Sequence, residues 1–245
     1  MGHAETTIVC VNVSPSLRAT YRPLWRQMTA QQWGKVRCWD YQQGLDEGAD
    51  VFQAVDALSD YLRQLDRPVH LLGHGLSGAV GWWATAQCPQ AVQSLSLLAV
   101  HPCPTLTWHS HYYVQRHLMP CSQEQILLRL SRSLFGDPLP FCWRSVVRAL
   151  AVDLEASPSP HSLWQVAAAT AALVPNVPLF IGGSADDPVV VPEVLTQWPQ
   201  RNGDCLWIAP QGRHFFHLSQ ATALAAALVQ FWQGIPSQRG EPLPH

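Results

Sequence analysis

The chain has 245 residues, a length at which an α/β fold commonly forms one domain with a single hydrophobic core. Its 15 basic and 17 acidic side chains give a formal net charge of −2, and the basic residues are scattered along the chain. This pattern excludes the basic stripe that is typical of nucleic-acid-binding proteins.

The first residues, Met1 to Thr7, have neither the basic start nor the apolar stretch of a signal peptide. No apolar run approaches the roughly 20 residues that a membrane-spanning helix needs. The seven cysteines are dispersed and form no Cys-x-x-Cys pair, so we expect reduced and mostly buried thiols. We therefore expect a soluble protein of the cytoplasm.

Between residues 7 and 100 the hydrophobic pattern alternates between strands and helices. The β-rich run Thr7–Val13 ends at the turn Ser14-Pro15-Ser16, and apolar residues at helical spacing follow from Leu17 to Met28. The next helix is ended by Arg67-Pro68. The further predicted elements are a strand at 36–39, a helix at 51–65, a strand at 68–72, a helix at 76–86 and a strand at 95–100.

The alternation lapses between His101 and Asn176, where helical patterns are interrupted by prolines, and we interpret this stretch as an inserted helical lid. It resumes with a strand at 178–181, a helix at 191–198, a strand at 205–209 and a last helix at 219–232. Strands alternating with helices predict an α/β fold with a doubly wound, mostly parallel sheet. We expect one domain over residues 1–245, with a disordered tail from Gly234.

The segment between the strand at 68–72 and the helix at 76–86 has the composition of a sharp turn. Gly73 and Gly75 supply the permissive backbone that such a turn needs. The run Gly73-His74-Gly75-Leu76-Ser77-Gly78 resembles the G-x-S-x-G nucleophile elbow of the α/β-hydrolase superfamily, with Gly75 where its serine stands. Serine-triad chemistry is therefore not possible. Ser77 lies in the first helical turn, and we interpret its hydroxyl as a capping or packing group.

Three later segments carry the same resemblance. In chain order they are similar to the passage after the elbow helix, the acid loop and the histidine loop of that superfamily. The segments are Ala86–Leu95, Gly183–Pro188 and Gly212–His217. The resemblance implies that His214 is the catalytic base and that Asp186 orients it, with Asp187 as a close second choice. An imidazole titrates near neutrality, and a carboxylate on its far nitrogen fixes its tautomer. We interpret His217 as structural.

The site that would bind an oxyanion also departs from the family pattern. Where the superfamily usually shows His-Gly after its first conserved strand, this chain has Asn12-Val13. Backbone N–H groups near Val13 or Ser14, with that of Leu76 at a helix N-terminus, would form an anion-binding pair. Asn12 either donates a hydrogen bond into the site or satisfies local backbone at the strand end.

The predicted lid contains a cluster of histidine and aromatic residues at 108–113. We expect His111 and Tyr112 to line a mainly apolar pocket together with His74 and Gly75. The His-x-His spacing is also a possible metal-chelating pair, but no carboxylate or thiolate stands at a convincing third position. We therefore expect neither a metal nor another cofactor.

The sequence leaves several functions open. The leading hypothesis is a protein that keeps the pocket and the His214–Asp186 pair but has lost covalent serine catalysis. It would bind a small apolar ligand, acyl or ester-like, or a protein partner. The alternative is a hydrolase of esters, thioesters or related substrates in which His214 activates a water directly. A third possibility is a serine hydrolase whose nucleophile has been engineered away, with Gly75 in its place.

Overall fold

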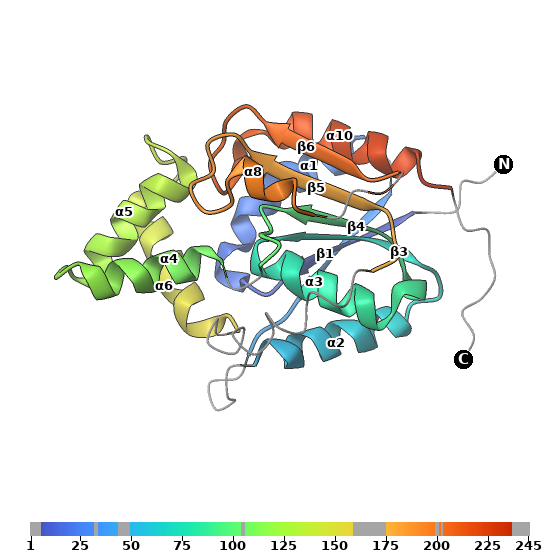
Figure 1. Cartoon of the computed structure of the whole chain (residues 1–245), viewed down its shortest axis with the longest axis horizontal. Coiled ribbons are helices and arrows are strands. Elements are labelled where there is room, and N and C mark those ends of the chain that lie inside the picture. The colour runs from blue at the N-terminus through green and yellow to red at the C-terminus, as the bar shows by residue number, and fades with distance from the viewer. Residues whose placement is uncertain are drawn as a thin grey trace.

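A computed structural model describes residues 6–31, 34–43, 50–103, 106–158, 175–198, 201 and 203–236. Within these residues, six parallel strands form one sheet in the order β2-β1-β3-β4-β5-β6 (Figure 1). The strands are β1 (Thr7–Asn12), β2 (Lys35–Asp40), β3 (Val69–His74), β4 (Val92–Leu98), β5 (Leu179–Ser184) and β6 (Cys205–Ala209). The prediction of an α/β fold with a mostly parallel sheet is therefore confirmed.

Both faces of the sheet are covered by helices, which is why the residues of the central strand β3 are all buried. On one face lie α2 (Val51–Arg63) and α3 (Leu76–Gln87), and on the other lie α1 (Arg22–Ala30) and α10 (Ala221–Gln233). Because neighbouring side chains of a strand point to opposite faces, Leu71 packs with the first pair of helices and Leu72 with the second.

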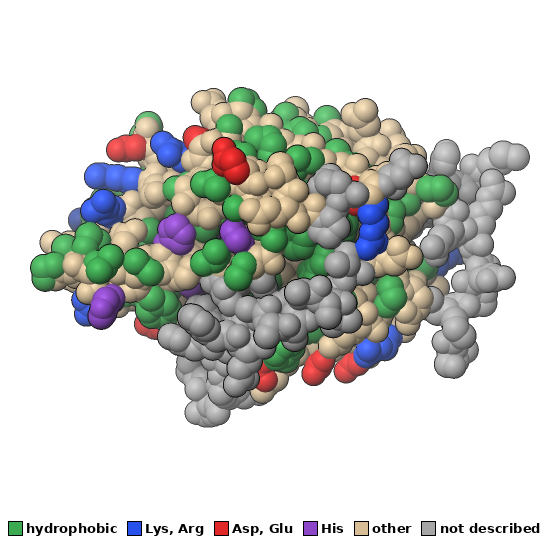
Figure 2. All heavy atoms as spheres, viewed as in Figure 1, with side chains coloured by type: hydrophobic (Ala, Val, Ile, Leu, Met, Phe, Trp, Pro, Cys, Tyr) green, Lys and Arg blue, Asp and Glu red, His purple; other side chains and the backbone are tan. Residues whose placement is uncertain are grey.

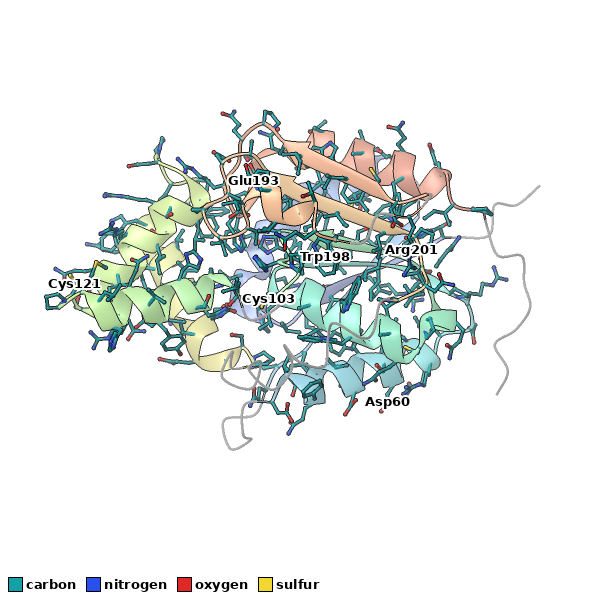
Figure 3. The ribbon with its side chains drawn as sticks, in the orientation of Figure 1. Asp60, Cys103, Cys121, Glu193, Trp198 and Arg201 are labelled. Atoms are coloured by element: carbon teal, nitrogen blue, oxygen red, sulfur yellow. The ribbon has the colours of Figure 1, made fainter. Side chains whose placement is uncertain are left out.

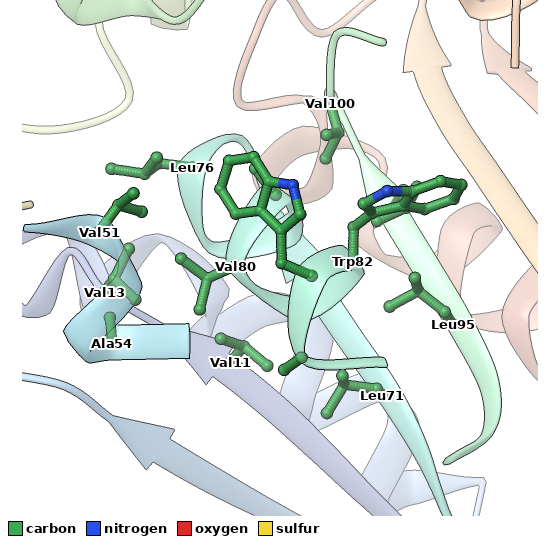
Figure 4. Packing of buried hydrophobic residues seen from close by; sticks show 14 of the residues in the cluster. Val11, Val13, Val51, Ala54, Leu71, Leu76, Val80, Trp82, Leu95 and Val100 are labelled. Carbon is green, nitrogen blue, oxygen red and sulfur yellow. The ribbon is translucent and has the colours of Figure 1, made fainter. Parts of the chain in front are cut away.

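The face covered by α2 and α3 holds the larger hydrophobic core. Figure 4 shows Val11 and Leu71 of the sheet packed against Val80 and Trp82 of α3. The Trp82 ring also lies 4.6 Å, between ring centroids, from that of Trp198, which appears near the middle of Figure 3. The Trp198 indole donates a 3.0 Å hydrogen bond to the carbonyl oxygen of Val100, so it ties the segment after β5 to the end of β4.

Among the residues that the structure describes, three helices follow β4 and precede β5, where the sequence predicts a lid. They are α4 (Trp108–Leu118), α5 (Gln123–Phe135) and α6 (Trp143–Ala156), and we call them the insert helices. They gather at one end of the molecule, shown on the left in Figure 1, where Figure 2 shows apolar side chains at the surface. The α6 helix contacts the segment after β1, and Phe215 N–H bonds to Leu134 O of α5. The insert helices therefore meet loops at the carboxyl ends of the strands.

The shorter elements differ in detail from the prediction. The first predicted helix is divided into a 3-10 helix, η1 (Pro15–Tyr21), and α1, because Pro23 occupies the first turn of a new helix. The last predicted helix corresponds to α10, and a short helix that was not predicted, α9 (Phe216–Ser219), precedes it. The α8 helix (Pro192–Leu195) is shorter than expected. A second 3-10 helix, η2 (Pro89–Ala91), precedes β4. Parts of the predicted lid (104–105 and 159–174) and the tail from 237 lie outside the described residues.

No helix in the described part of the chain combines the length and the apolar character needed to cross a membrane.

Candidate active site

The turn between β3 and α3 has the backbone geometry of a nucleophile elbow. Gly75 has φ 53° and ψ −126°, a conformation that residues with a side chain rarely adopt. Its N–H donates a 2.9 Å hydrogen bond to the carbonyl oxygen of Leu98 in β4. A Cβ atom on Gly73 would lie 2.6 Å from Cα of Gly78, and one on Gly78 would lie 2.9 Å from the carbonyl oxygen of Gly73, so these two positions need glycine where strand and helix cross closely. The fold therefore holds the elbow without any contribution from a serine.

The position of the missing side chain faces an imidazole. A Cβ atom built on Gly75 would meet one side chain within 4 Å, that of His214, whose Nε2 atom would be 3.9 Å away. A hydroxyl group one bond beyond that Cβ would approach hydrogen-bonding distance of Nε2. The elbow and the histidine thus keep the mutual geometry of a nucleophile and its base.

The carboxylate that orients His214 is Asp187. His214 Nδ1 lies 3.0 Å from Asp187 Oδ2 and 3.3 Å from Oδ1, and both side chains are buried. Asp187 Oδ1 also accepts hydrogen bonds from the N–H groups of Val189 (2.8 Å) and Val190 (3.1 Å). Burial alone would raise the pKa of Asp187, but the His214 ring and these N–H donors outweigh it and hold the pKa below its ordinary value.

The sequence-based choice of Asp186 is therefore wrong, and the second choice is the one that faces the histidine. Asp186 accepts hydrogen bonds from the Ser184 hydroxyl (2.7 Å) and the Arg213 N–H (2.8 Å), and pairs with the Arg213 guanidinium. Arg213 has a positive φ of 58°, and Asp186 braces this turn directly before His214. Adjacent carboxylates at the end of β5 point in different directions, which a motif position does not reveal.

The expected anion-binding amides are only partly open. The Val13 N–H donates a 3.0 Å hydrogen bond to the Ser77 hydroxyl oxygen, and the Ser14 N–H donates a 3.2 Å bond to Asn12 Oδ1. Asn12 itself donates to Asp40 at 2.6 Å, so its amide serves the strand end rather than the site. Leu76 is the first residue of α3, and a helix leaves its first N–H groups without intrahelical partners. Leu76 is thus the best-placed oxyanion donor.

Comparisons with known proteins identify the family of this chain. A family model described as the alpha/beta hydrolase family matches residues 14–227. The chain belongs to the α/β-hydrolase family. An uncharacterized protein of Nostoc sp. is 38% identical over 94% of this chain and 91% of its own length. A second uncharacterized protein, of Synechocystis sp., is 35% identical over 96% of this chain and 93% of its own.

Solved structures share the fold of this α/β-hydrolase at low sequence identity. A serine hydrolase involved in carbazole degradation matches with a TM-score of 0.65 at 14% identity, over 95% of this chain and 92% of the other. A bacterial membrane phospholipase A matches with a TM-score of 0.69 at 14% identity, over 96% and 80%. A hydrolase from Oleispira antarctica gives 0.63 at 16% identity, over 94% and 93%. At this identity the likeness concerns the fold alone.

Two further buried histidines surround the base of this α/β-hydrolase. His74 Nε2 donates a 2.8 Å hydrogen bond to the carbonyl oxygen of His214, and its ring lies 4.6 Å from that of His217. Burial lowers the pKa of His74 to about 3, and the nearby His214 ring acts in the same direction. Burial likewise holds the pKa of His217 well below its ordinary value. Both imidazoles are neutral at pH 7, so they pack the loop of His214 without adding charge.

The space above the elbow is small. A cavity of about 30 Å³ touches His74, Gly75, Leu76 and His214, which is room for about two water molecules. His111 and Tyr112 are not among its lining residues, contrary to expectation. Asn12 and Val13, which were expected to bind an anion at this site, do not line it either. Tyr112 is instead buried in the larger core, because the first turn of α4 directs other residues to the site.

The insert contributes residues that sequence reasoning did not select. Thr107, Trp108 and His109 line the cavity from the start of α4. The signal for them was weak: a threonine directly before a helix usually indicates only a cap. Ser77, expected to cap or pack, is buried and bonded to Val13 as described above. Among the described residues, no group of three His, Cys, Asp or Glu side chains is placed to hold a metal ion.

Proposed function

We propose that this α/β-hydrolase cleaves small apolar esters or thioesters by general-base catalysis, without an acyl-enzyme intermediate. The observation that carries the proposal is the direction of His214: its Nε2 atom faces the position that a serine side chain would occupy, while Asp187 holds Nδ1. Because Asp187 accepts the Nδ1 proton, the lone pair of the neutral imidazole lies on Nε2, toward the cavity. A water in that cavity is the group that this base would activate.

The proposed reaction needs only the groups around the cavity. His214 Nε2 takes a proton from water while the water oxygen attacks the carbonyl carbon of the substrate. The carbonyl π electrons move to oxygen, where the Leu76 N–H at the N-terminus of α3 stabilises the charge. When the bond to the leaving group breaks, the departing atom takes up the proton held on Nε2. Ester and water thereby become acid and alcohol.

A groove beside the cavity supports an apolar substrate. It has a volume of about 360 Å³, within the range of roughly 300–1,000 Å³ of small-molecule sites. Phe135, Phe141 and Val146 of the insert contribute to its walls, and Leu17 and Thr20 of η1 line both the groove and the cavity. An acyl chain in the groove would therefore lead to a carbonyl group at Gly75.

The test is hydrolysis of p-nitrophenyl acetate and p-nitrophenyl octanoate by the protein and its His214→Ala variant. General-base catalysis predicts that the variant loses at least about 10²-fold in kcat/KM, and that the protein shows no burst phase. In the groove, Ser145→Trp is expected to raise KM for the octanoate but not for the acetate. Arg148→Trp on the same helix, outside the groove, is the control.

Non-covalent ligand binding is the second candidate, and one observation favours it. The Val13 N–H, which would be the second oxyanion donor, already bonds to Ser77. Loss of one such donor commonly costs 10²–10³ in turnover. If His214→Ala hydrolyses both esters as fast as the unaltered protein, the hydrolase proposal is overturned. Thermal stabilisation by fatty-acyl ligands that bind the groove would then support a binding protein, because a ligand at 100 times its Kd stabilises by about 2.7 kcal/mol.

A further inference from the structure

The α4 helix has apolar side chains on two opposite faces. On its inner face, Trp108 and Tyr112 are buried in the larger hydrophobic core. On its outer face, three large apolar side chains are exposed to solvent: Tyr113 by 39%, Val114 by 58% and Leu118 by 71%. A helix that is apolar all round is typical of a buried position, whereas a helix at the surface of a globular protein usually has a polar outer face. The outer face of α4 therefore has the composition of a covered surface.

The neighbouring helix α5 shows the usual arrangement. Its buried side is apolar, and its exposed side chains are all polar or charged: Gln123, Glu124, Gln125, Arg129 and Arg132. Both helices belong to the same insert and lie at the same end of the molecule. The apolar outer face of α4 is therefore a feature of that helix and needs an explanation of its own.

Basic side chains border this apolar face. The α4 helix contains no acidic residue, and Arg116 and His117 lie in its last turn. Arg129 of α5 is at the same end, because its guanidinium lies 3.6 Å from the sulfur of Met119, directly after α4. From the start of α4 to Arg129 the only acidic residue is Glu124, in a chain whose formal net charge is −2. Figure 2 shows basic side chains beside the apolar ones at this end of the molecule.

The two arginines have positive charge available for an anionic partner. Arg116 donates a 3.0 Å hydrogen bond to the carbonyl oxygen of Cys121, which marks the far end of the insert in Figure 3. Among the described residues, neither Arg116 nor Arg129 forms a salt bridge with a carboxylate. A guanidinium has five N–H donors in a planar fork that fits the oxygens of a phosphate. The charge and the apolar face together fit a partner that is anionic at its surface and apolar beneath it.

We propose that the outer face of α4 binds the surface of a bilayer that contains anionic phospholipids. Val114 and Leu118 enter the boundary between headgroups and acyl chains, and Arg116 and Arg129 bind lipid phosphates. The ring and hydroxyl group of Tyr113 suit the same boundary, where one end of the side chain is apolar and the other is wet. The contact is peripheral, because a helix of 11 residues is too short to span a bilayer.

A second copy of the chain fits this face less well. A symmetric contact between two copies places the same residues of each copy at one interface, so the arginines of both copies would lie together without carboxylates between them. A bilayer surface supplies the missing negative charge. The proposal does not depend on the hydrolysis proposed above, because binding to lipid is measured without an ester substrate.

The experiment measures flotation of the full chain with vesicles on a density gradient. The protein is expected to bind vesicles of equal parts phosphatidylglycerol and phosphatidylcholine at least about 10-fold more tightly than vesicles of phosphatidylcholine alone, since each arginine at an anionic surface contributes about a 5-fold factor. Added salt should weaken the binding, because it screens these charges. Arg116→Gln should lower the partition coefficient about 5-fold.

A matched pair of variants tests the apolar part of the contact. Val114→Asp should weaken binding to the anionic vesicles at least about 10-fold, because it removes apolar contact and adds a negative charge. Val152→Asp is the control, since Val152 is an exposed valine of α6 (42%) and the substitution changes the net charge by the same amount. Both positions are exposed, so both variants should keep the Tm of the unaltered protein.

Three results would overturn the proposal. The first is equal binding to the two kinds of vesicle, or no binding to either. The second is an equal loss of binding in Val114→Asp and Val152→Asp, which would show that the outer face of α4 is not the contact. The third is a dimer in sedimentation velocity that Val114→Asp dissociates, which would assign this face to a second copy of the chain. Failure of the His214-dependent hydrolysis would leave all three measurements unaffected.

Discussion

The loop after β3 and the loop after β6 supply the two halves of the site, and only the second keeps its reactive side chain. At the elbow, Gly75 has the backbone conformation of a nucleophile without the nucleophile. After β6, His214 keeps its carboxylate partner, and that partner keeps its two backbone donors. The difference between these two loops shows that the geometry of the elbow depends on the close crossing of β3 and α3, not on a serine.

The His214–Asp187 pair is more informative about function than the elbow is, because burying ionisable side chains costs free energy. Removing charged groups from water is unfavourable, and a buried ion pair is often no more stable than an apolar replacement. A protein that needed only the fold would gain nothing obvious from His214 and Asp187 beside an elbow without a nucleophile. Perturbed ionisable groups in a cavity are instead typical of functional sites. This contrast favours a site that still transfers protons.

Restoring a serine at position 75 is expected to have the largest effect on the reactivity of the site. Gly75→Ser is expected to create labelling by a fluorophosphonate probe where the unaltered protein shows none, because Nε2 of His214 already faces the new side chain. In serine proteases the loss of that hydroxyl costs about 10⁶ in turnover. The positive φ of Gly75 predicts a stability cost on the order of 1–3 kcal/mol, measured by urea unfolding.

Gly75→Ala is the matched control, since it introduces the same backbone strain without a hydroxyl group. Ser77→Ala in the Gly75→Ser background releases the Val13 N–H, and it should speed labelling if that donor is the missing half of the oxyanion site. A folded Gly75→Ser protein that resists the probe in both backgrounds would show that the histidine half is also inactive.

Substitution of Asp187 and substitution of Asp186 should have clearly different effects on the rate of hydrolysis. Asp187→Asn is expected to remove most of the His214-dependent hydrolysis, about 10²-fold or more, because an amide at Nδ1 no longer fixes the productive tautomer. Asp186→Asn should change kcat within a few-fold, since Asp186 binds Ser184 and Arg213 rather than the imidazole. The rates are measured with p-nitrophenyl acetate. Equal losses in the two variants would contradict the assignment of Asp187.

The sequence predicted the fold and the histidine that lies at the elbow, but not the carboxylate beside that histidine. Strand and helix alternation, with the glycines at 73 and 75, is a local pattern, and local patterns determine where parallel strands and the elbow form. The choice between Asp186 and Asp187 depends on how one turn is rotated, because each carboxylate fits the same spacing from Gly183. Backbone donors at Val189 and Val190, which a motif does not show, direct Asp187 toward His214.

The insert was harder to predict for a related reason. Aromatic and imidazole groups often line pockets, which favours His111 and Tyr112, but the rotation of a helix decides which of its side chains reach a cavity. In the structure the first turn of α4 brings Trp108 and His109 to the cavity. The pairing of His109 with Asp153 joins residues 44 positions apart in two helices, a separation for which the sequence carries no local signal.

The smallest expected effect concerns His74, whose ring lies between the two halves of the site and bonds to the backbone of His214. Its pKa is about 3 in the folded protein against 6.5 for the ordinary group, so between these values the unfolded chain binds the proton and the folded protein does not. The free energy of unfolding therefore falls as pH falls below about 6.5, and this one group accounts for a loss of about 2 kcal/mol between pH 7 and pH 5.

His74→Gln, which keeps an N–H donor for the His214 carbonyl, should reduce this acid-induced loss of stability by that amount in urea unfolding at pH 7, 6 and 5. His117→Gln at the surface should leave the loss unchanged. If His74→Gln and His117→Gln lose stability in parallel with the unaltered protein, His74 is protonated in the folded state, and the two halves of the site are not joined by a neutral imidazole.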